Sequence, residues 1–188
     1  MPPRRRRADA QRSIAAILDA AVKVLNTRPD ASMEEIAQAA GVTRQTVYAH
    51  YPSRDALVIA VGERALADVL SALEAAELGK GPPEDALERL LDITWEAAEE
   101  ILRIPFPRFA AEEERELHDP MFEPLERLIR RGQRAGAFDR RLPSAWLGTS
   151  FFALSHAAAE EVAAGRLSPA RARKLLRRSV LHLFGVPD

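Results

Sequence analysis

The sequence predicts an all-α protein, and three observations support this prediction. Hydrophobic residues make up 47% of the 188 residues, and much of that share is Ala and Leu, which favour helices. Apolar residues recur every three or four positions along most of the chain, whereas alternating β-branched and aromatic residues are scarce. Pro and Gly divide the chain into segments of helical length. We expect about nine helices, arranged in two domains at residues 1–53 and 54–188.

The first predicted helix runs from Ser13, its N-cap, to about Asn26. Its apolar residues follow the spacing of one buried face, and they are Ile14, Ile17, Leu18, Ala21, Val22 and Leu25. Residues 2–7 before it contain two prolines and four adjacent arginines, so we expect an arm that is disordered in isolation. Such an arm is either a solvated tail or, beside a DNA-binding motif, a DNA contact in which Arg5, Arg6 and Arg7 follow the phosphates or reach into a minor groove.

Two short helices joined by a tight turn are predicted between residues 33 and 51. Ser32 followed by Glu35 forms a capping-box pattern at the start of the first of them. Gly41 can adopt the left-handed conformation that ends this helix, and Thr43 is a suitable N-cap for the second helix, residues 44–51. This arrangement is a helix-turn-helix, a motif that places its second helix in the major groove of DNA.

The rest of the chain also has helical periodicity. The remaining predicted helices cover residues 54–77, 83–104, 110–117, 120–135, 143–164 and 168–184. Ser53 and Ser168 are the expected N-caps of the first and last of these. Pro105 and Pro107 are expected to end the helix at residues 83–104, and Gly165 is expected to end the helix at residues 143–164.

Charge and composition exclude several classes of protein. The chain has no cysteine, which rules out disulfides, thiolate nucleophiles and cysteine-based zinc sites. Residues 1–52 carry eight Lys or Arg and five Asp or Glu, whereas residues 53–188 carry 19 Lys or Arg and 23 Asp or Glu. The N-terminal part is therefore basic and the remainder acidic, as expected for a DNA-binding segment joined to a module that does not bind DNA. No apolar run is long enough for a membrane span, and we expect a cytoplasmic protein.

Enzymatic readings have little support. The paired glutamates are adjacent on helices and therefore point apart, and the serines lack the context of a nucleophile. His118 and Asp119 have no second ligand pair at helical spacing, so we expect no metal site. We also expect no cofactor and no catalytic residue.

The helix at residues 44–51 has the side chains that base recognition needs. Arg44 can donate two hydrogen bonds to guanine, and Gln45 can pair with adenine. Thr43 and Thr46 can offer a hydroxyl or a methyl group, and Tyr48 is long enough to reach a phosphate or a thymine methyl.

Four neighbouring positions have a structural alternative to DNA contact. We expect Val47 to lie in the core. We expect Tyr51 to pack against the first and fourth helices instead of contacting DNA. His50 and Tyr48 are either DNA contacts or half-buried structural residues, and we favour DNA contact.

Residues Ile14–Val61 resemble the N-terminal domain of TetR-type (tetracycline-repressor) transcriptional regulators. The residues that carry the resemblance are Ala37, Gly41-Val42, Thr46-Val47-Tyr48, His50-Tyr51, Ser53, Arg54 and Leu57. The turn at residues 28–31 departs from the family, in which a glycine and an aromatic residue are common. The remaining residues match the family only in being helical and of suitable length.

The resemblance implies a dimeric transcriptional regulator, which we expect to be a repressor. It is expected to leave a palindromic operator when a small molecule binds residues 54–188. Positions matching Thr43–Thr46, Tyr48, His50 and Arg54 are then expected to contact double-stranded DNA. The candidate effector pocket comprises Trp95, Glu99, Phe109, His118, Phe122, Phe152 and His156. The candidate homodimer interface comprises Trp146, Ala157, Leu175, Leu176, Val180 and Leu183. For many of these residues, burial in the chain's own core is the alternative. The alternative function is a helical ligand-binding or interaction module that no longer regulates transcription.

Overall fold

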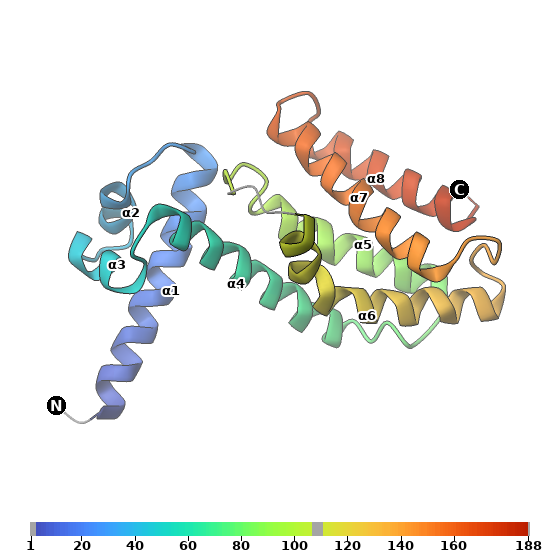
Figure 1. The fold of residues 1–188 in the computed structure, drawn as a ribbon, viewed down its shortest axis with the longest axis horizontal. Coiled ribbons are helices and arrows are strands. Elements are labelled where there is room, and N and C mark those ends of the chain that lie inside the picture. The colour runs from blue at the N-terminus through green and yellow to red at the C-terminus, as the bar shows by residue number, and fades with distance from the viewer. Residues whose placement is uncertain (1–2, 107–110, 188) are drawn as a thin grey trace. The chain divides into compact units, whose positions relative to one another are not determined.

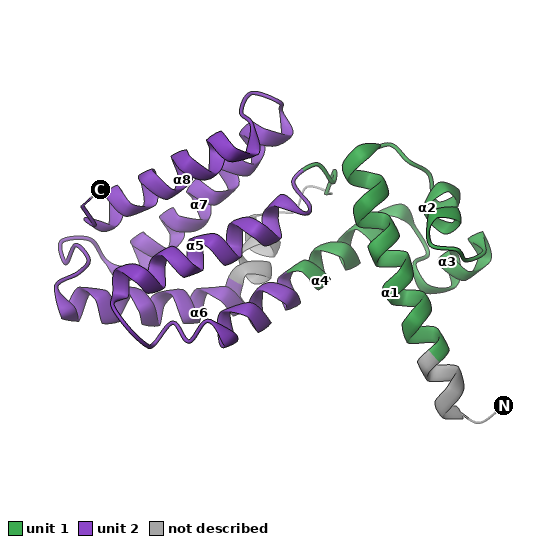
Figure 2. Ribbon diagram, turned by 180° about the vertical axis from the view of Figure 1, so that it is seen from behind, with its two compact units in different colours: residues 1–65, 103–108 green, residues 66–102, 109–188 purple. Residues whose placement is uncertain are grey.

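The computed structural model describes the backbone of residues 3–106 and 111–187, with side chains described except at residues 3–8 and 111–118. Eight helices and no strand occur in this described part of the chain (Figure 1), which confirms the all-α class. The helices form two compact units (Figure 2), one of residues 1–65 with 103–108 and one of residues 66–102 with 109–188. The division therefore falls inside the fourth helix and not at the expected boundary after residue 53.

The first unit contains α1 (Pro3–Thr27), α2 (Met33–Ala39), α3 (Arg44–His50) and the first part of α4 (Arg54–Ala75). Its fully buried apolar side chains are Ile17, Ala21, Leu25, Ile36, Val47, Leu57 and Val58. An ion pair between Arg64 and Asp19, 2.6 Å long, joins α4 to α1 at the edge of this core. Removing these side chains from water is the main source of stability, because no single short helix is stable alone.

The start of α1 differs from the prediction. The helix begins at Pro3 and not at Ser13, so the segment expected to be disordered is helical from Pro3 onward. Ser13 is not an N-cap, since its hydroxyl donates to the Asp9 carbonyl within the helix at 3.1 Å. An ion pair between Arg12 and Asp9, one turn apart, also supports the added turns. Proline is tolerated in a first helical turn, and arginine has a good helix propensity.

The second unit contains α5 (Pro83–Glu99), α6 (Ala111–Ala135), α7 (Ser144–Ala163), α8 (Pro169–Phe184) and the end of α4. Its core is built by the apolar faces of these helices and includes Leu87, Trp95, Leu125, Ile129, Leu147, Phe151, Val180 and Phe184. Helices α7 and α8 pack side by side (Figure 1). The predicted N-cap of α8 is confirmed, because the Ser168 side chain accepts a hydrogen bond from the Arg171 N–H.

The structure merges two predicted helices into α6. We expect a break between residues 117 and 120 from the sequence, because a proline inside a helix removes a hydrogen bond. In the structure Pro120 and Pro124 both lie inside α6. They are about one turn apart, so the two missing N–H groups fall on the same face of the helix. The described residues thus form eight helices instead of about nine, and α5 ends at Glu99, before the expected end at residue 104.

Candidate nucleic-acid interface

The helix-turn-helix is fixed by local hydrogen bonds that confirm its predicted caps. The Ser32 hydroxyl accepts from the Glu35 N–H at 3.3 Å, and the Glu35 carboxylate accepts from the Ser32 N–H at 2.8 Å. The hydrogen bond from the Ser32 backbone is the main reason why the pKa of Glu35 lies below its ordinary value. Gly41 has the expected left-handed backbone, with φ of +68°. These bonds set where α2 begins and where it turns toward α3.

Helix α3 has one buried face and one exposed face. The Thr43 hydroxyl caps the helix by accepting from the Thr46 N–H at 3.1 Å, and the two threonine hydroxyls lie 2.8 Å apart. Val47 is completely buried, as predicted. Tyr51, just after the helix, is half-buried, and burial raises the pKa of its hydroxyl. These contacts fix the rotation of α3 about its own axis and therefore decide which side chains face solvent.

Arg44, Gln45 and Tyr48 form the exposed face of α3. Tyr48 is 40% exposed, which is high for a large aromatic residue. The guanidinium of Arg44 lies over its ring, 5.3 Å from the centroid, as expected for residues four positions apart on a helix. This face offers hydrogen-bond donors, hydrogen-bond acceptors and an aromatic edge to a ligand that approaches from solvent.

His50 and Thr46 are less exposed than the three residues of that face. The ring of His50 lies beside that of Tyr51, with centroids 6.4 Å apart and an interplanar angle of 52°. His50 is thus partly buried and still accessible at the end of α3. This position allows contact with a ligand at the edge of the face but does not require it.

Arg54 donates its hydrogen bonds to the turn between α1 and α2. Its Nη2 group donates to the Pro29 carbonyl, and its Nε group donates to the Ala31 carbonyl at 3.4 Å. An ion pair between Arg28 and Glu35 spans the same turn. The sequence gives no signal for this use of Arg54, because the partners lie more than 20 residues away in the chain. The turn that departs from the family pattern is therefore held from α4 by an arginine.

A shallow hollow lies between α2 and α3, with a volume of about 370 Å³. Glu34, Gln38 and Arg44 provide its polar lining, and Ala37 and Val42 its apolar lining. The Glu34 carboxylate lies 3.7 Å from the Arg44 guanidinium. Sequence reasoning missed Glu34, because a glutamate in the first turn of a helix is normally explained by its favourable interaction with that helix. Arg5, Arg6 and Arg7 are in α1, but their side chains lie outside the described residues.

The predicted effector residues of the second unit are only partly brought together. Phe122 and Phe152 stack with centroids 6.0 Å apart and an interplanar angle of 22°. His156 is half-buried and Glu99 is exposed, whereas Trp95 is 3% exposed and belongs to the core. Phe109 and the His118 side chain lie outside the described residues. Among the predicted pocket residues whose side chains are described, Phe122 and Phe152 form a stacked ring pair.

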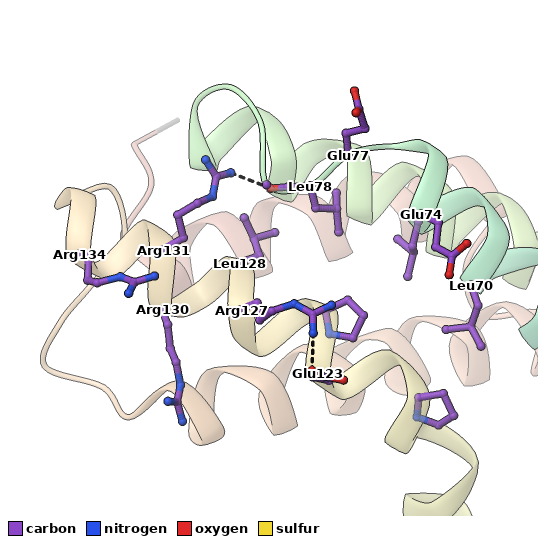
Figure 3. A pocket seen from close by; sticks show the side chains of 14 residues that line it. Leu70, Glu74, Glu77, Leu78, Glu123, Arg127, Leu128, Arg130, Arg131 and Arg134 are labelled. Carbon is purple, nitrogen blue, oxygen red and sulfur yellow. Dashed lines mark hydrogen bonds and ion pairs between the residues drawn. The ribbon is translucent and has the colours of Figure 1, made fainter.

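A larger groove in the second unit lies between the end of α4 and α6, with a volume of about 750 Å³ (Figure 3). Its apolar wall includes Leu70, Leu73 and Leu128. Arg131 closes one end by donating to the Gly81 carbonyl at 2.7 Å and to the Leu78 carbonyl at 2.8 Å. Of the five predicted pocket residues whose side chains are described, none lines this groove. The sequence did not identify it, because its walls come from segments about 50 residues apart.

The predicted dimer residues divide into exposed and buried groups. Trp146 is 58% exposed and Leu175 is 41% exposed, and Ala157 is also at the surface. Leu176 and Val180 pack inside the chain's own core, with exposures of 5% and 0%, which corresponds to the alternative of intrachain packing.

Leu183 is half-buried and packs against that core. Two arginines that flank the apolar stripe of α8 pair with α5: Arg173 donates to Asp92 at 2.8 Å, and Arg177 donates to Glu88. The α8 stripe thus contributes mainly to intrachain packing, with Leu175 at its exposed edge.

Among the side chains that the structure describes, no group of three or more His, Cys, Asp or Glu could hold a metal ion. In the same part of the chain, no helix combines the length and the apolar character that a membrane span requires.

Comparisons with known proteins agree with this geometry. Residues 17–61 match the family model described as "Bacterial regulatory proteins, tetR family". The chain is 31% identical over 151 residues to the HTH-type transcriptional repressor LfrR of Mycolicibacterium smegmatis, covering 80% of this chain and 79% of the relative. The crystal structure of LfrR from Mycobacterium smegmatis in complex with proflavine matches with a TM-score of 0.67 at 29% identity, covering 92% of this chain and 96% of that chain.

A likeness of fold alone extends to the fatty acid degradation regulator FadR from Bacillus halodurans. Its TM-score is 0.72 at 18% identity, and the match covers 92% of this chain and 95% of that chain. The identity with LfrR and its coverage, together with the family match over the helix-turn-helix, are decisive for the relationship. The chain therefore belongs to the tetR family of bacterial regulatory proteins and is a DNA-binding transcriptional regulator.

Proposed function

We propose that this regulator is a repressor that binds a palindromic operator as a homodimer and leaves it when a small molecule binds the second unit. The observation that carries the proposal is the exposed polar face of α3 on a helix whose opposite face and caps are fixed. Base recognition needs rigid placement of a few donors and acceptors in the major groove. A helix held by its buried face and its N-cap has that rigidity.

The proposed DNA contacts divide into base and phosphate contacts. Arg44 and Gln45 read bases, since their side chains match the hydrogen-bonding edges of guanine and adenine. Thr43 and Thr46 lie beside them at the start of α3 and contact a base or a phosphate. Tyr48 contacts a phosphate or a thymine methyl group. Together these residues read only a few base pairs.

Three further regions are proposed to contact phosphates. His50 lies at the accessible end of α3 and reaches the backbone there. Arg54 uses two of its five N–H donors on the turn at residues 29–31, so any phosphate contact uses the remaining donors. Arg5, Arg6 and Arg7 add charge at the start of α1, and their contribution depends on salt concentration and not on sequence.

A second copy of the chain completes the operator site. One recognition helix reads too few base pairs for a unique address, whereas two helices set roughly 34–36 Å apart match a palindrome. The proposed interface is the exposed face of α7 and α8 around Trp146, Ala157 and Leu175. Large exposed apolar side chains on a folded surface often mark such an interface.

The second unit is proposed to bind the effector. LfrR is named a repressor, and one of its structures holds proflavine. In this chain the stacked pair Phe122 and Phe152 offers an aromatic wall, with His156 one turn further along α7 and with Trp95 and Glu99 on α5. Phe109 and His118 are proposed to extend this site. A flat aromatic ligand suits such a wall, because aromatic rings stack favourably.

Selection of duplexes from a randomised DNA library tests the operator part of the proposal. We expect an enriched inverted repeat, bound by two chains per duplex in sedimentation experiments. Proflavine fluorescence titrations of the free and the operator-bound protein test the effector part. Because linkage is reciprocal, bound operator must weaken proflavine binding by the factor by which proflavine weakens operator binding. The absence of any enriched sequence, or equal proflavine affinity in both titrations, would contradict the respective part.

A further inference from the structure

Glu34 lies beside the proposed base-reading arginine, although it belongs to the preceding helix. Its Oε2 atom lies 3.7 Å from Nη1 of Arg44, and the guanidinium carbon of Arg44 lies 5.3 Å from the Tyr48 ring centroid. Helix α3 has no acidic residue of its own. The carboxylate that approaches Arg44 therefore comes from α2, and the guanidinium is held between a carboxylate and an aromatic face.

The exposure of this pair argues against a role in folding stability alone. The Arg44 side chain is 62% exposed and that of Glu34 is 75% exposed, and both line the hollow between α2 and α3. Ion pairs that exposed contribute little to stability. A carboxylate near the DNA-facing surface also repels phosphates, which weakens binding to any duplex. Its expected effect is therefore on how Arg44 meets DNA.

We propose that Glu34 is a positioning residue that determines specificity at the base pair read by Arg44. The inference rests on the proposed DNA contact of Arg44. A guanidinium has five N–H donors, so one edge can remain with Glu34 while the other donates to O6 and N7 of guanine. Holding the side chain before binding reduces the rotamer entropy lost on contact. At any other base pair the hydrogen bonds of Arg44 contribute less to the binding free energy, while the repulsion between Glu34 and the phosphates still weakens binding.

The test is a double-mutant cycle read by DNA binding. Glu34→Gln is made in the wild-type chain and in an Arg44→Ala chain, and both are titrated against the selected duplex, its single-base variants and an unrelated duplex. Fluorescence anisotropy at several salt concentrations gives the Kd values, and thermal melting checks that each variant folds. Glu63→Gln, which removes an exposed carboxylate from α4 in the same unit, is the matched charge control.

With Arg44 present, we expect Glu34→Gln to lower discrimination at one base pair by about two- to fivefold, the range for an exposed ion pair. It should also tighten binding to the unrelated duplex. In the Arg44→Ala chain the same change should leave discrimination unaltered. Glu34→Asp, which keeps the charge but shortens the side chain, should lower discrimination without tightening unrelated binding.

Two results would overturn the inference while the proposed function stands. In the first, Glu34→Gln discriminates between base pairs as well as the wild type does. In the second, Glu34→Gln lowers discrimination by the same factor in the wild-type chain and in the Arg44→Ala chain. An equal loss in Glu63→Gln would show a general effect of charge and would also refute the positioning role. If the wild-type chain prefers no duplex at all, the proposed function fails and this inference fails with it.

Discussion

Gly132 lies inside α6 under the ring of Phe138, and we predict that Gly132→Ala destabilises the second unit. A Cβ atom added at this position would lie 2.1 Å from Cδ2 and 2.3 Å from Cε2 of Phe138. Phe138 is 2% exposed, and its ring meets that of the buried Phe184 edge-on with centroids 5.4 Å apart. The added methyl group must therefore displace a ring that other core side chains surround.

The magnitude follows from two opposing effects. Alanine stabilises a helix interior by about 1 kcal/mol relative to glycine. Forcing an extra carbon into a packed core costs about 1–3 kcal/mol, and partly exposing a phenylalanine loses part of the roughly 1.5–3 kcal/mol that its burial provides. The steric cost is the larger effect, so we expect a net loss of about 2 kcal/mol. In a chain of this size that corresponds to a fall in Tm of about 4–8 °C.

Urea unfolding followed by tryptophan fluorescence measures this loss where it occurs, because Trp95 and Trp146 both belong to the second unit. Gly62→Ala in α4 is the control. Its added carbon would lie 3.0 Å from Cε1 of the half-buried Phe106, so a much smaller clash opposes the helix propensity of alanine, and we expect little change. In a second cycle, Phe138→Leu should cost less in the Gly132→Ala chain than in the wild type. A Gly132→Ala chain at least as stable as the wild type would refute the steric reasoning.

Four other predictions follow from the structure. Arg44→Ala should remove discrimination at one operator base pair, a loss of about 1–3 kcal/mol in titrations against single-base variants. Deleting residues 2–7 should weaken binding to all duplexes alike and flatten its salt dependence, and a changed base preference would contradict this. Arg54→Ala should lower the free energy of unfolding by about 1 kcal/mol, because two carbonyls of the turn lose their donor. Hydrogen bonds from the Arg141 side chain and backbone lower the pKa of Asp139 to about 2, from 3.8. Stabilisation by this carboxylate is therefore present above pH 3.8 and is lost as the pH falls toward 2, so the stability difference between wild type and Asp139→Asn should shrink over that range.

The features that the sequence predicted correctly depend on residues close together in the chain. The capping box needs Ser32 and Glu35, and the N-cap of α3 needs Thr43 and the N–H group three residues later. Such signals act within one helical turn, so they can be read without knowing the fold. The left-handed backbone of Gly41 follows in the same way, because few other residues adopt it at low cost.

The features that the sequence missed depend on contacts between distant segments or on the sum of weak preferences. The start of α1 at Pro3 and the continuity of α6 through Pro120 override local signals that favour a later start and a break. In α8 the apolar stripe predicts that one face is covered, but not by what. Leu176 is buried in the chain's own core and the adjacent Leu175 is exposed, because neighbouring helical residues point about 100° apart. Only the packing of α7 and α5 against α8 separates the two.

The arginines show most clearly why residue type and motif position are not enough to assign a role. Arg44, Arg54 and Arg131 have the same side chain, and each is able to bind a phosphate or a base. Arg131 donates to two loop carbonyls in the second unit, and Arg54 donates to two carbonyls of the turn before α2. Arg44 instead lies between a carboxylate and an aromatic ring, at the surface, with donors that no backbone carbonyl of the described residues takes in the structure. A guanidinium already bonded to backbone must give up those bonds to bind DNA, whereas Arg44 can keep one edge on Glu34 and offer its remaining donors to a base. For this physical reason we propose base reading for Arg44 and a mainly structural role for Arg54.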